Sequence, residues 1–275
     1  MFIKNRDLNL VRNHFDATHY LGQLDFEVGR GFDAAMHYCQ KGWLRRLDPS
    51  GWFSTDYYLL SNPRIYPSQT NPFLHYLRVG RKKGLRTMFV EDPYVLGVAE
   101  EIKEGFDPDF YVEKYGHAIT IKDDPTLDYA AFGYMRGWWP RADFCPTFYI
   151  FNNEDLMVDG LFPFLHYVQN GKTEGRAPST EWTDKSTSKY GLIEPYFDTL
   201  YYVNQISESY HGLYVDWIDH YLLYGWKQKV NACRLFDSHK YLFMNLDIWK
   251  GEIEPLSHYL EFGMAEGRTR YKVGL

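Results

Sequence analysis

The stretches WFSTDYYLLSNP (residues 52–63) and NPFLHYLRVGRKKG (residues 71–84) decide the fold of this 275-residue chain, because their pattern recurs six times. Each copy starts with a phenylalanine and has a tyrosine five positions later. It ends with a His-Tyr pair, which is Asp-Tyr in the third copy, and a glycine four residues after that pair's tyrosine. The copies, numbered 1 to 6, span residues 15–42, 53–80, 106–133, 144–171, 197–225 and 236–263.

The spacing of the copies contains a second, longer period. Their leading phenylalanines are separated by 38, 53, 38, 53 and 39 residues, so the copies form pairs that recur every 91 residues. Such self-similarity is typical of repeat architectures. We therefore expect one continuous domain of three homologous units, at residues 1–87, 88–178 and 179–275.

Each pair is preceded by an additional segment, at residues 7–14, 92–105 and 186–196. The first two segments have the spacing of short amphipathic helices, whereas the third contains Gly191 and Pro195 and fits that spacing less well. The Ser- and Thr-rich stretch at residues 177–189 is predicted to be an exposed loop.

Every copy is predicted to form a hairpin of two short helices, since Asp and Asn at the right positions cap the free N–H groups of a first turn. The first helix should follow Asp16, Ser54, Asp107, Asp198 or Asp237, and the second Asp33, Asn71, Asp124, Phe162, Asp216 or Glu254. Cys145 interrupts the first series, so copy 4 is expected to be capped by Thr147 or to fray. The final glycine of each copy is expected to close the second helix in a left-handed conformation.

Helices of about eight residues do not persist alone in water, so their stability must come from stacking of the hairpins. The expected fold is therefore all-α, with six helical-hairpin repeats in three pseudo-repeated units. Both a solenoid-like array and a compact pseudo-threefold arrangement are compatible with this pattern.

The composition argues against several partners and sites. The formal net charge is −6 and the basic residues are scattered, whereas a nucleic-acid backbone requires a basic face. The sequence contains no run of 18 apolar residues, so no membrane span is predicted. Residues 1–11 contain no apolar run of signal-peptide length. The three widely spaced cysteines, Cys39, Cys145 and Cys233, suggest neither a disulfide framework nor a zinc site. We expect a protein that is cytoplasmic when it is made.

The repeated pattern resembles a known bacterial repeat. The stretches FPFLHYVQNGKTEGRAP (162–178) and EPLSHYLEFGMAEGR (254–268) are similar to its second half, and FDPDFYVEKYG (106–116) is similar to its first half. Repeats of this type occur beside glycosyltransferase domains in bacterial proteins that act on cell-surface polysaccharide. The resemblance extends over residues 15–268 and leaves no stretch for a glycosyltransferase domain. It implies an association with glycans rather than a reaction.

Five copies carry a histidine at one recurrent position, namely His37, His75, His166, His220 and His258. A metal site would need several of these groups to converge, but stacked repeats would spread them along the array. We expect a structural role without bound metal, in which each imidazole bonds a backbone carbonyl or a helix cap of its own repeat. Asp128 at this position in copy 3 fits a replaceable polar contact.

The sequence contains no recognisable catalytic constellation. Asp107-Pro108-Asp109 matches the Asp-x-Asp string of metal-dependent glycosyltransferases, but helix capping accounts for it, since Asp107 fills the cap position and Pro108 the first turn. There is no nucleotide-binding glycine loop after a strand and no Gly-x-Ser-x-Gly motif. We therefore predict that the protein is not an enzyme and uses no cofactor.

Aromatic residues make up 19% of the chain, and several tryptophans occupy predicted turns. An indole face at a turn can stack on a sugar ring, and arginines nearby can bind acidic sugar groups. The predicted carbohydrate-binding residues are Trp43, Trp138, Trp139, Arg141, Arg176, Trp182, Trp226 and Arg268. The alternative role for each tryptophan is packing between repeats.

These features favour a non-catalytic protein that binds bacterial cell-surface polysaccharide of the capsular kind. One form of the hypothesis makes the chain a spike or fibre component of a phage-like particle, released when the cell lyses. The alternative is a structural scaffold that docks a separate glycosyltransferase of a glycan-synthesis assembly or assembles with copies of itself.

Overall fold

A computed structural model describes residues 3–24, 26–90 and 93–273, without the side chain of Trp182, and every regular element in these ranges is helical. The only strand-like pairs in the described ranges are isolated bridges, Ser50–Phe53, Arg141–Phe144 and Cys233–Phe236. The predicted all-α class is therefore confirmed. The chain divides into two compact units, Met1–Asp92 and Pro93–Leu275.

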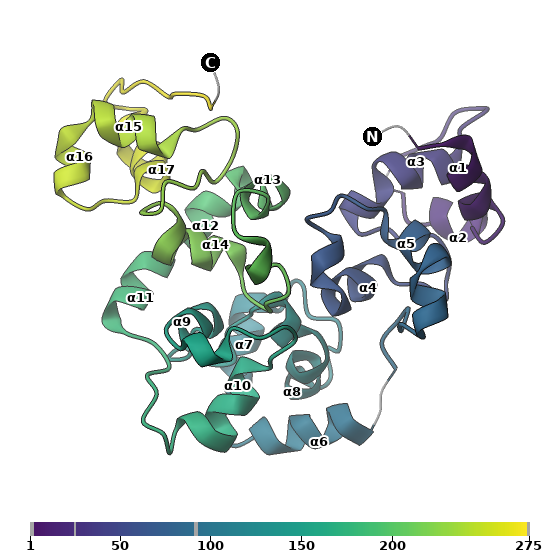
Figure 1. Cartoon of the computed structure of the whole chain (residues 1–275), viewed down its shortest axis with the longest axis horizontal. Coiled ribbons are helices and arrows are strands. Elements are labelled where there is room, and N and C mark those ends of the chain that lie inside the picture. The colour runs from purple at the N-terminus through teal and green to yellow at the C-terminus, as the bar shows by residue number, and fades with distance from the viewer. Residues whose placement is uncertain (1–2, 25, 91–92, 274–275) are drawn as a thin grey trace. The chain divides into compact units, whose positions relative to one another are not determined.

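The first unit contains copies 1 and 2 (Figure 1). Its helices are α1 (Asn5–Arg12), α2 (Ala17–Leu21), α3 (Ala34–Gln40), α4 (Thr55–Ser61) and α5 (Pro72–Arg78), with 3₁₀ turns η1 (Gly42–Arg45), η2 (Pro63–Ile65) and η3 (Gly80–Lys83). Helix α1 packs across α3 and α5, which are the second helices of the two copies. The additional segment before the pair therefore joins the two hairpins.

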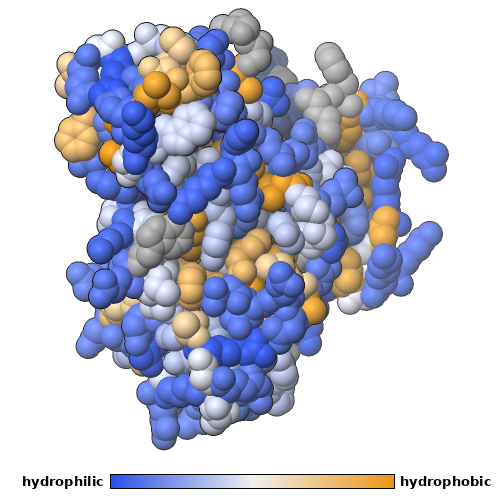
Figure 2. Space-filling model, turned by 60° about the vertical axis from the view of Figure 1, so that its left-hand side comes forward, coloured by the Kyte–Doolittle hydropathy of each residue, from blue (hydrophilic) through white to orange (hydrophobic). Residues whose placement is uncertain are grey.

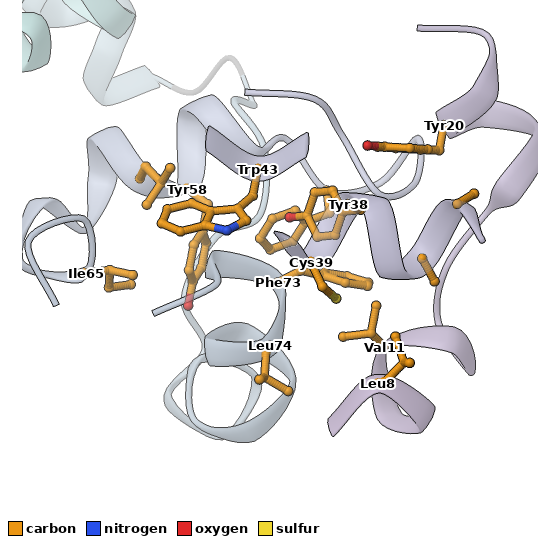
Figure 3. Packing of buried hydrophobic residues seen from close by; sticks show 14 residues of the cluster. Leu8, Val11, Tyr20, Tyr38, Cys39, Trp43, Tyr58, Ile65, Phe73 and Leu74 are labelled. Carbon is orange, nitrogen blue, oxygen red and sulfur yellow. The ribbon is translucent and has the colours of Figure 1, made fainter. Parts of the chain in front are cut away.

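The core of this unit is largely aromatic, as Figure 3 shows. Leu8 and Val11 of α1 point toward Phe73 of α5, and Tyr38 of α3 packs edge-on against the Phe73 ring, with the ring centroids 6.2 Å apart. Trp43 lies within the same cluster and is only 3% exposed. Because each large ring removes much apolar surface from water, such side chains let short helices form a stable core.

The second unit contains copies 3 to 6 and repeats this arrangement twice. Its α-helices are α6 (Pro93–Ile102), α7 (Pro108–Tyr115), α8 (Pro125–Asp128), α9 (Pro146–Phe151), α10 (Pro163–His166), α11 (Glu181–Thr187), α12 (Tyr190–Ile193), α13 (Thr199–Val203), α14 (Trp217–His220), α15 (Ser238–Met244), α16 (Leu246–Lys250) and α17 (Pro255–His258). Its shorter 3₁₀ turns are η5 (Tyr134–Arg136), η6 (Glu154–Leu156), η8 (Glu194–Tyr196) and η9 (Glu208–Tyr210). Helix α6 packs on α8 and α10, and α12 packs on α14 and α17, so each additional helix again contacts the second helices of both copies.

One loop prediction is wrong. Residues 177–189 do not form an exposed loop, because α11 occupies most of this stretch. The hydroxyl of Thr180 accepts a hydrogen bond from the backbone N–H of Thr183, and the Thr183 hydroxyl accepts one from the N–H of Thr180. This reciprocal pair is a capping box, which lets a Ser- and Thr-rich segment start a helix.

The predicted cap residues are the observed N-caps of both helices in every copy, except for the first helix of copy 4. Phe162 has no side-chain acceptor and makes no capping hydrogen bond. Cys145 replaces the usual oxygen with sulfur, since its Sγ accepts from the backbone N–H of Phe148 at 3.4 Å. Copy 4 is therefore capped by Cys145 itself, and not by Thr147 as predicted.

The recurrent glycine has a different role from the predicted one. At Gly42, Gly80, Gly133, Gly171, Gly225 and Gly263 an added Cβ would lie no more than 2.5 Å from the hydroxyl oxygen of the recurrent first-helix tyrosine of the same copy. Gly133 is right-handed, with φ −59° and ψ −42°. The glycine therefore makes room for a buried hydroxyl instead of closing the helix in a left-handed conformation.

The left-handed residue comes four positions after this glycine. It is Arg46, Gly84, Gly137, Gly175, Lys229 or Gly267, depending on the copy. In copies 3 to 6 the chain reaches the recurrent glycine through a π-helical turn, at Tyr129–Gly133 (η4), Tyr167–Gly171 (η7), Tyr221–Gly225 (η10) and Tyr259–Gly263 (η11). The helix thus ends one turn later than the sequence pattern predicts.

Candidate functional site

The recurrent tyrosine of each first helix bonds the side chain at the histidine position of the second. The pairs are Tyr20–His37 (2.7 Å), Tyr58–His75 (2.8 Å), Tyr111–Asp128 (2.8 Å), Tyr149–His166 (2.9 Å), Tyr202–His220 (2.7 Å) and Tyr241–His258 (3.0 Å). In each histidine pair the imidazole uses Nδ1. Each of these histidines therefore bonds a tyrosine hydroxyl of the facing helix. The prediction that its partner would be a backbone carbonyl or a helix cap is wrong.

Burial favours the neutral form of four of these imidazoles. Removal from water lowers the pKa of His220 to about 4, and it also lowers the pKa of His37, His75 and His258. Within residues 3–24, 26–90 and 93–273, no three His, Cys, Asp or Glu side chains form a group that could hold a metal ion. The histidine position thus joins the two helices of a hairpin.

Two predicted sugar-binding arginines, Arg176 and Arg268, make the same set of bonds in different copies. Arg176 forms two bonds of 2.8 Å to Asp155, bonds Asn153 at 3.1 Å and pairs with Glu174. Arg268 bonds Asp247, Asn245 and Glu266 in the same way and lowers the pKa of Asp247 to about 2. Each guanidinium is therefore neutralised by two carboxylates of its own copy.

Arg141 lies at a hollow of about 390 Å³ with an acidic lining. Its guanidinium pairs with Asp143, and Glu104 and Asp107 lie in the same lining. The three carboxylates outnumber the one cation, which disfavours an acidic ligand at this place.

The predicted tryptophans fall into different environments. Trp43 and Trp139 are 3% and 4% exposed, and the Trp139 Nε1–H donates to the carboxylate of Asp219 at 2.7 Å. Trp138 is half-buried and stacks on Tyr115, with ring centroids 4.5 Å apart and planes inclined by 3°. The side chain of Trp182 lies outside the described part of the structure. Trp43, Trp138 and Trp139 thus serve packing.

Trp226 is the predicted tryptophan that lines a surface hollow. The hollow has a volume of about 350 Å³ and is lined by Trp226, Lys227, Lys229, His239, Leu242, Trp249 and Glu252. The Trp226 Nε1–H donates to the carbonyl of Leu222 at 3.1 Å, which fixes the ring, and Lys227 Nζ lies 5.4 Å from the ring centroid. Trp249 of α16 is 53% exposed.

The backbone of this hollow is strained at two positions. Lys229 and Glu252 have φ values of 64° and 51°, a left-handed conformation that costs a non-glycine residue about 1 kcal/mol or more. Four other copies have glycine at the position of Lys229. Backbone strain of this kind clusters at functional sites, and it also occurs at Arg46 in copy 1.

Lys229, His239 and Trp249 are not among the carbohydrate-binding residues predicted from the sequence. Trp249 follows no repeat glycine and lies in α16, in the segment between the two conserved helices of copy 6. One feature of the sequence could have identified Lys229. Most copies have a second glycine four positions after the recurrent glycine, and copy 5 has Lys229 at that position instead.

The fold and this hollow define an all-helical protein with an aromatic and basic surface site. Comparison of the chain with protein-family models, curated proteins and solved structures gives no match. Within the described residues, no helix combines the length and apolar character needed to cross a membrane.

Proposed function

We propose that the protein binds bacterial cell-surface polysaccharide of an acidic, capsular kind without catalysing a reaction, and that the sugar occupies the hollow between Trp226 and Trp249. The observation that carries this proposal is the combination of two indoles with Lys227 and Lys229 around one hollow of about 350 Å³.

The chemistry of the lining suits an acidic sugar. The C–H faces of a pyranose pack on indole rings, and lysine ammonium groups attract carboxylate or sulfate substituents. Glu252 is the one carboxylate among the lining residues, so the two lysines leave an excess of positive charge. The Glu252 carboxylate can accept hydrogen bonds from sugar hydroxyls. The lining therefore suits a polysaccharide in which charged groups alternate with hydroxyl groups.

The resemblance of the repeats to those found beside glycosyltransferase domains supports the same ligand class. A finer version places the protein in a phage-like particle as a spike or fibre that contacts the capsule. This version predicts co-purification of the protein with particles after lysis, whereas recovery in the cytosolic fraction alone contradicts it.

Replacing Lys229 with Gly is expected to weaken binding of an acidic polysaccharide about tenfold without loss of stability, because it removes one charged partner and relieves the left-handed strain. Trp249→Ala should weaken binding by a similar factor, since its half-exposed ring is available for stacking. Calorimetric titration with capsular polysaccharide from the host, and with alginate and neutral dextran as references, measures both effects.

Arg46→Gly is the matched control, because Arg46 occupies the equivalent left-handed position of copy 1 in the other unit. It should leave the affinity unchanged. Equal affinities of the parent and the Lys229 and Trp249 variants would contradict the proposed site. Absence of saturable binding to any acidic glycan would contradict the function and favour the scaffold alternative.

A further inference from the structure

The arginine bonds described above establish which residues of copies 4 and 6 are equivalent. Arg176 bonds Asn153, Asp155 and Glu174, and Arg268 bonds Asn245, Asp247 and Glu266. Every residue of the second set lies 92 positions after its counterpart in the first. The segments 150–163 and 242–255 can therefore be compared residue by residue.

In copy 4 the apolar face of this segment is covered by the next copy along the chain. The Phe151 ring lies 4.5 Å from the His220 ring and 5.5 Å from the Tyr224 ring of copy 5, measured between centroids. Met157 and Leu161 pack with Phe151 on a cluster formed by Ile150 and, from the copy 5 side, Leu213 and Val215. The apolar face of copy 4 thus packs on an aromatic and aliphatic surface that belongs to another copy of the same repeat, copy 5.

The equivalent face of copy 6 is exposed. Its members Phe243, Trp249 and Ile253 correspond to Phe151, Met157 and Leu161, and they are 62%, 53% and 41% exposed. We call Phe243, Ile253, Met244 and Leu246 the terminal face, whereas Trp249 lines the hollow described above. Figure 2 shows hydrophobic side chains gathered at the upper left of the surface, over the C-terminal helices.

The terminal face is more apolar than its covered counterpart. Met244 and Leu246, 57% and 56% exposed, occupy the positions of Asn152 and Glu154 in copy 4. Clustered exposed apolar side chains of this kind indicate an interaction site.

Copy 6 also carries the receiving half of the contact. In copy 5 the half that receives Phe151 is the ring pair His220–Tyr224, whose centroids are 5.7 Å apart. The equivalent pair 38 residues later is His258–Phe262, with centroids 5.8 Å apart and with Phe262 49% exposed. One copy therefore has both the inserting ring, Phe243, and the receiving pair.

We propose that two molecules of this chain associate through the terminal face in a closed two-fold dimer. Phe243 of each molecule packs against the His258–Phe262 pair of the other, as Phe151 packs against His220–Tyr224 within one chain. A closed two-fold interface uses the same residues of both molecules, and copy 6 carries both the inserting and the receiving residues. The contact repeats an interface that the chain already uses internally.

Sedimentation equilibrium of the whole chain should show a species of about 65 kDa, twice the 32.6 kDa of one chain, with no larger species at higher concentration. Phe243→Ser should weaken the dimer at least about tenfold, as expected for an aromatic anchor at an interface. Leu235→Ser is the matched control, because Leu235 is 54% exposed and lies outside the terminal face. It should leave the dimer unchanged, and circular dichroism should show both variants folded.

The register of the dimer is tested by mixing two variants, Phe243→Cys and Phe262→Cys, under oxidising conditions. The mixture should give a covalent dimer in higher yield than either variant alone, since the native cysteines are all buried. A monomer at every concentration, open-ended polymers or an unaffected Phe243→Ser dimer would each overturn the proposal. Lys229→Gly should weaken sugar binding about tenfold and leave dimerisation unchanged, so failure of the two proposals can be distinguished.

Discussion

Replacing Gly225 with Ala should destabilise the second unit by about 3 kcal/mol, although glycine-to-alanine changes in helices usually stabilise. The new methyl group would overlap the Tyr202 hydroxyl and lie 3.0 Å from the ring carbon that carries it. Tyr202 is fully buried, so its ring has no free space into which to move. The overlap must therefore displace the hydroxyl from His220 or separate the two helices.

A double-mutant cycle isolates this contact. Tyr202→Phe alone should cost about 1–3 kcal/mol, because the buried His220 loses its hydrogen-bond partner. In the double variant the missing oxygen makes room for the methyl group, so the combined loss should be clearly smaller than the sum. Urea unfolding measures all three variants, and an additive result would contradict the assigned role of the glycine column.

Gly97→Ala provides the matched control in the same unit. Gly97 lies in α6 with no atom within 4 Å of its added Cβ, so alanine should stabilise by about 0.5–1 kcal/mol. Gly225→Ala should lower the unfolding free energy and Gly97→Ala should raise it. This difference separates the effect of the nearby Tyr202 hydroxyl from the general helix propensity of alanine.

Asp219 should make the second unit less stable as the pH rises above neutrality. Burial and the neighbouring Asp216 raise the pKa of Asp219 to about 8. An unfolded aspartate has a pKa near 3.9, so between about pH 4 and 8 the folded chain holds a proton that the unfolded chain has lost. Its contribution is complete below about pH 4 and is lost progressively as the pH rises toward about 8.

His220 has the opposite effect at lower pH. Its folded pKa of about 4 lies below the unfolded value of about 6.5, so its contribution is complete above pH 6.5 and is lost as the pH falls toward 4. The two slopes offset each other below pH 6.5. What remains from these two groups is a fall in stability between about pH 6.5 and 8.

Asp219→Asn should remove this fall while keeping an oxygen that accepts from the Trp139 indole. The difference in unfolding free energy between variant and parent should increase in favour of the variant by at least about 2 kcal/mol from pH 5 to pH 8.5. Asp109→Asn makes the same substitution at an exposed position of α7 and should give a constant difference. Parallel pH profiles of parent and Asp219→Asn would disprove the shifted pKa.

Local features of the fold could be predicted from the sequence, because they depend on neighbouring residues. The N-caps at Asp16 and Asp33, for example, follow from side-chain chemistry three residues from the bonded N–H. The purpose of Gly42 could not be predicted in this way. It depends on the Tyr20 hydroxyl, which lies 22 residues earlier and reaches the glycine only after the hairpin has closed.

The candidate site was predictable only in part, because position at a turn does not determine exposure. Trp226 and Trp43 both follow a recurrent glycine directly, yet one lines a hollow and the other lies in a core. Arg176 and Arg268 share the expected surface location, but carboxylates 21 residues earlier neutralise them. Such pairings arise from the tertiary arrangement of each copy.

The tyrosine bonds to the histidine position also bear on the order of folding. They join residues only 17 or 18 positions apart, so little loop-closure entropy opposes them. The bond from Trp139 to Asp219 spans 80 residues and must form after longer loops have closed. Individual hairpins are thus expected to form early in folding. The fraction of a mutation's stability loss that appears in the folding transition state should be near one at Tyr202 and near zero at Trp139. A chain emerging from the ribosome can close each hairpin as soon as both of its helices are synthesised, and packing against the neighbouring copy then stabilises that hairpin.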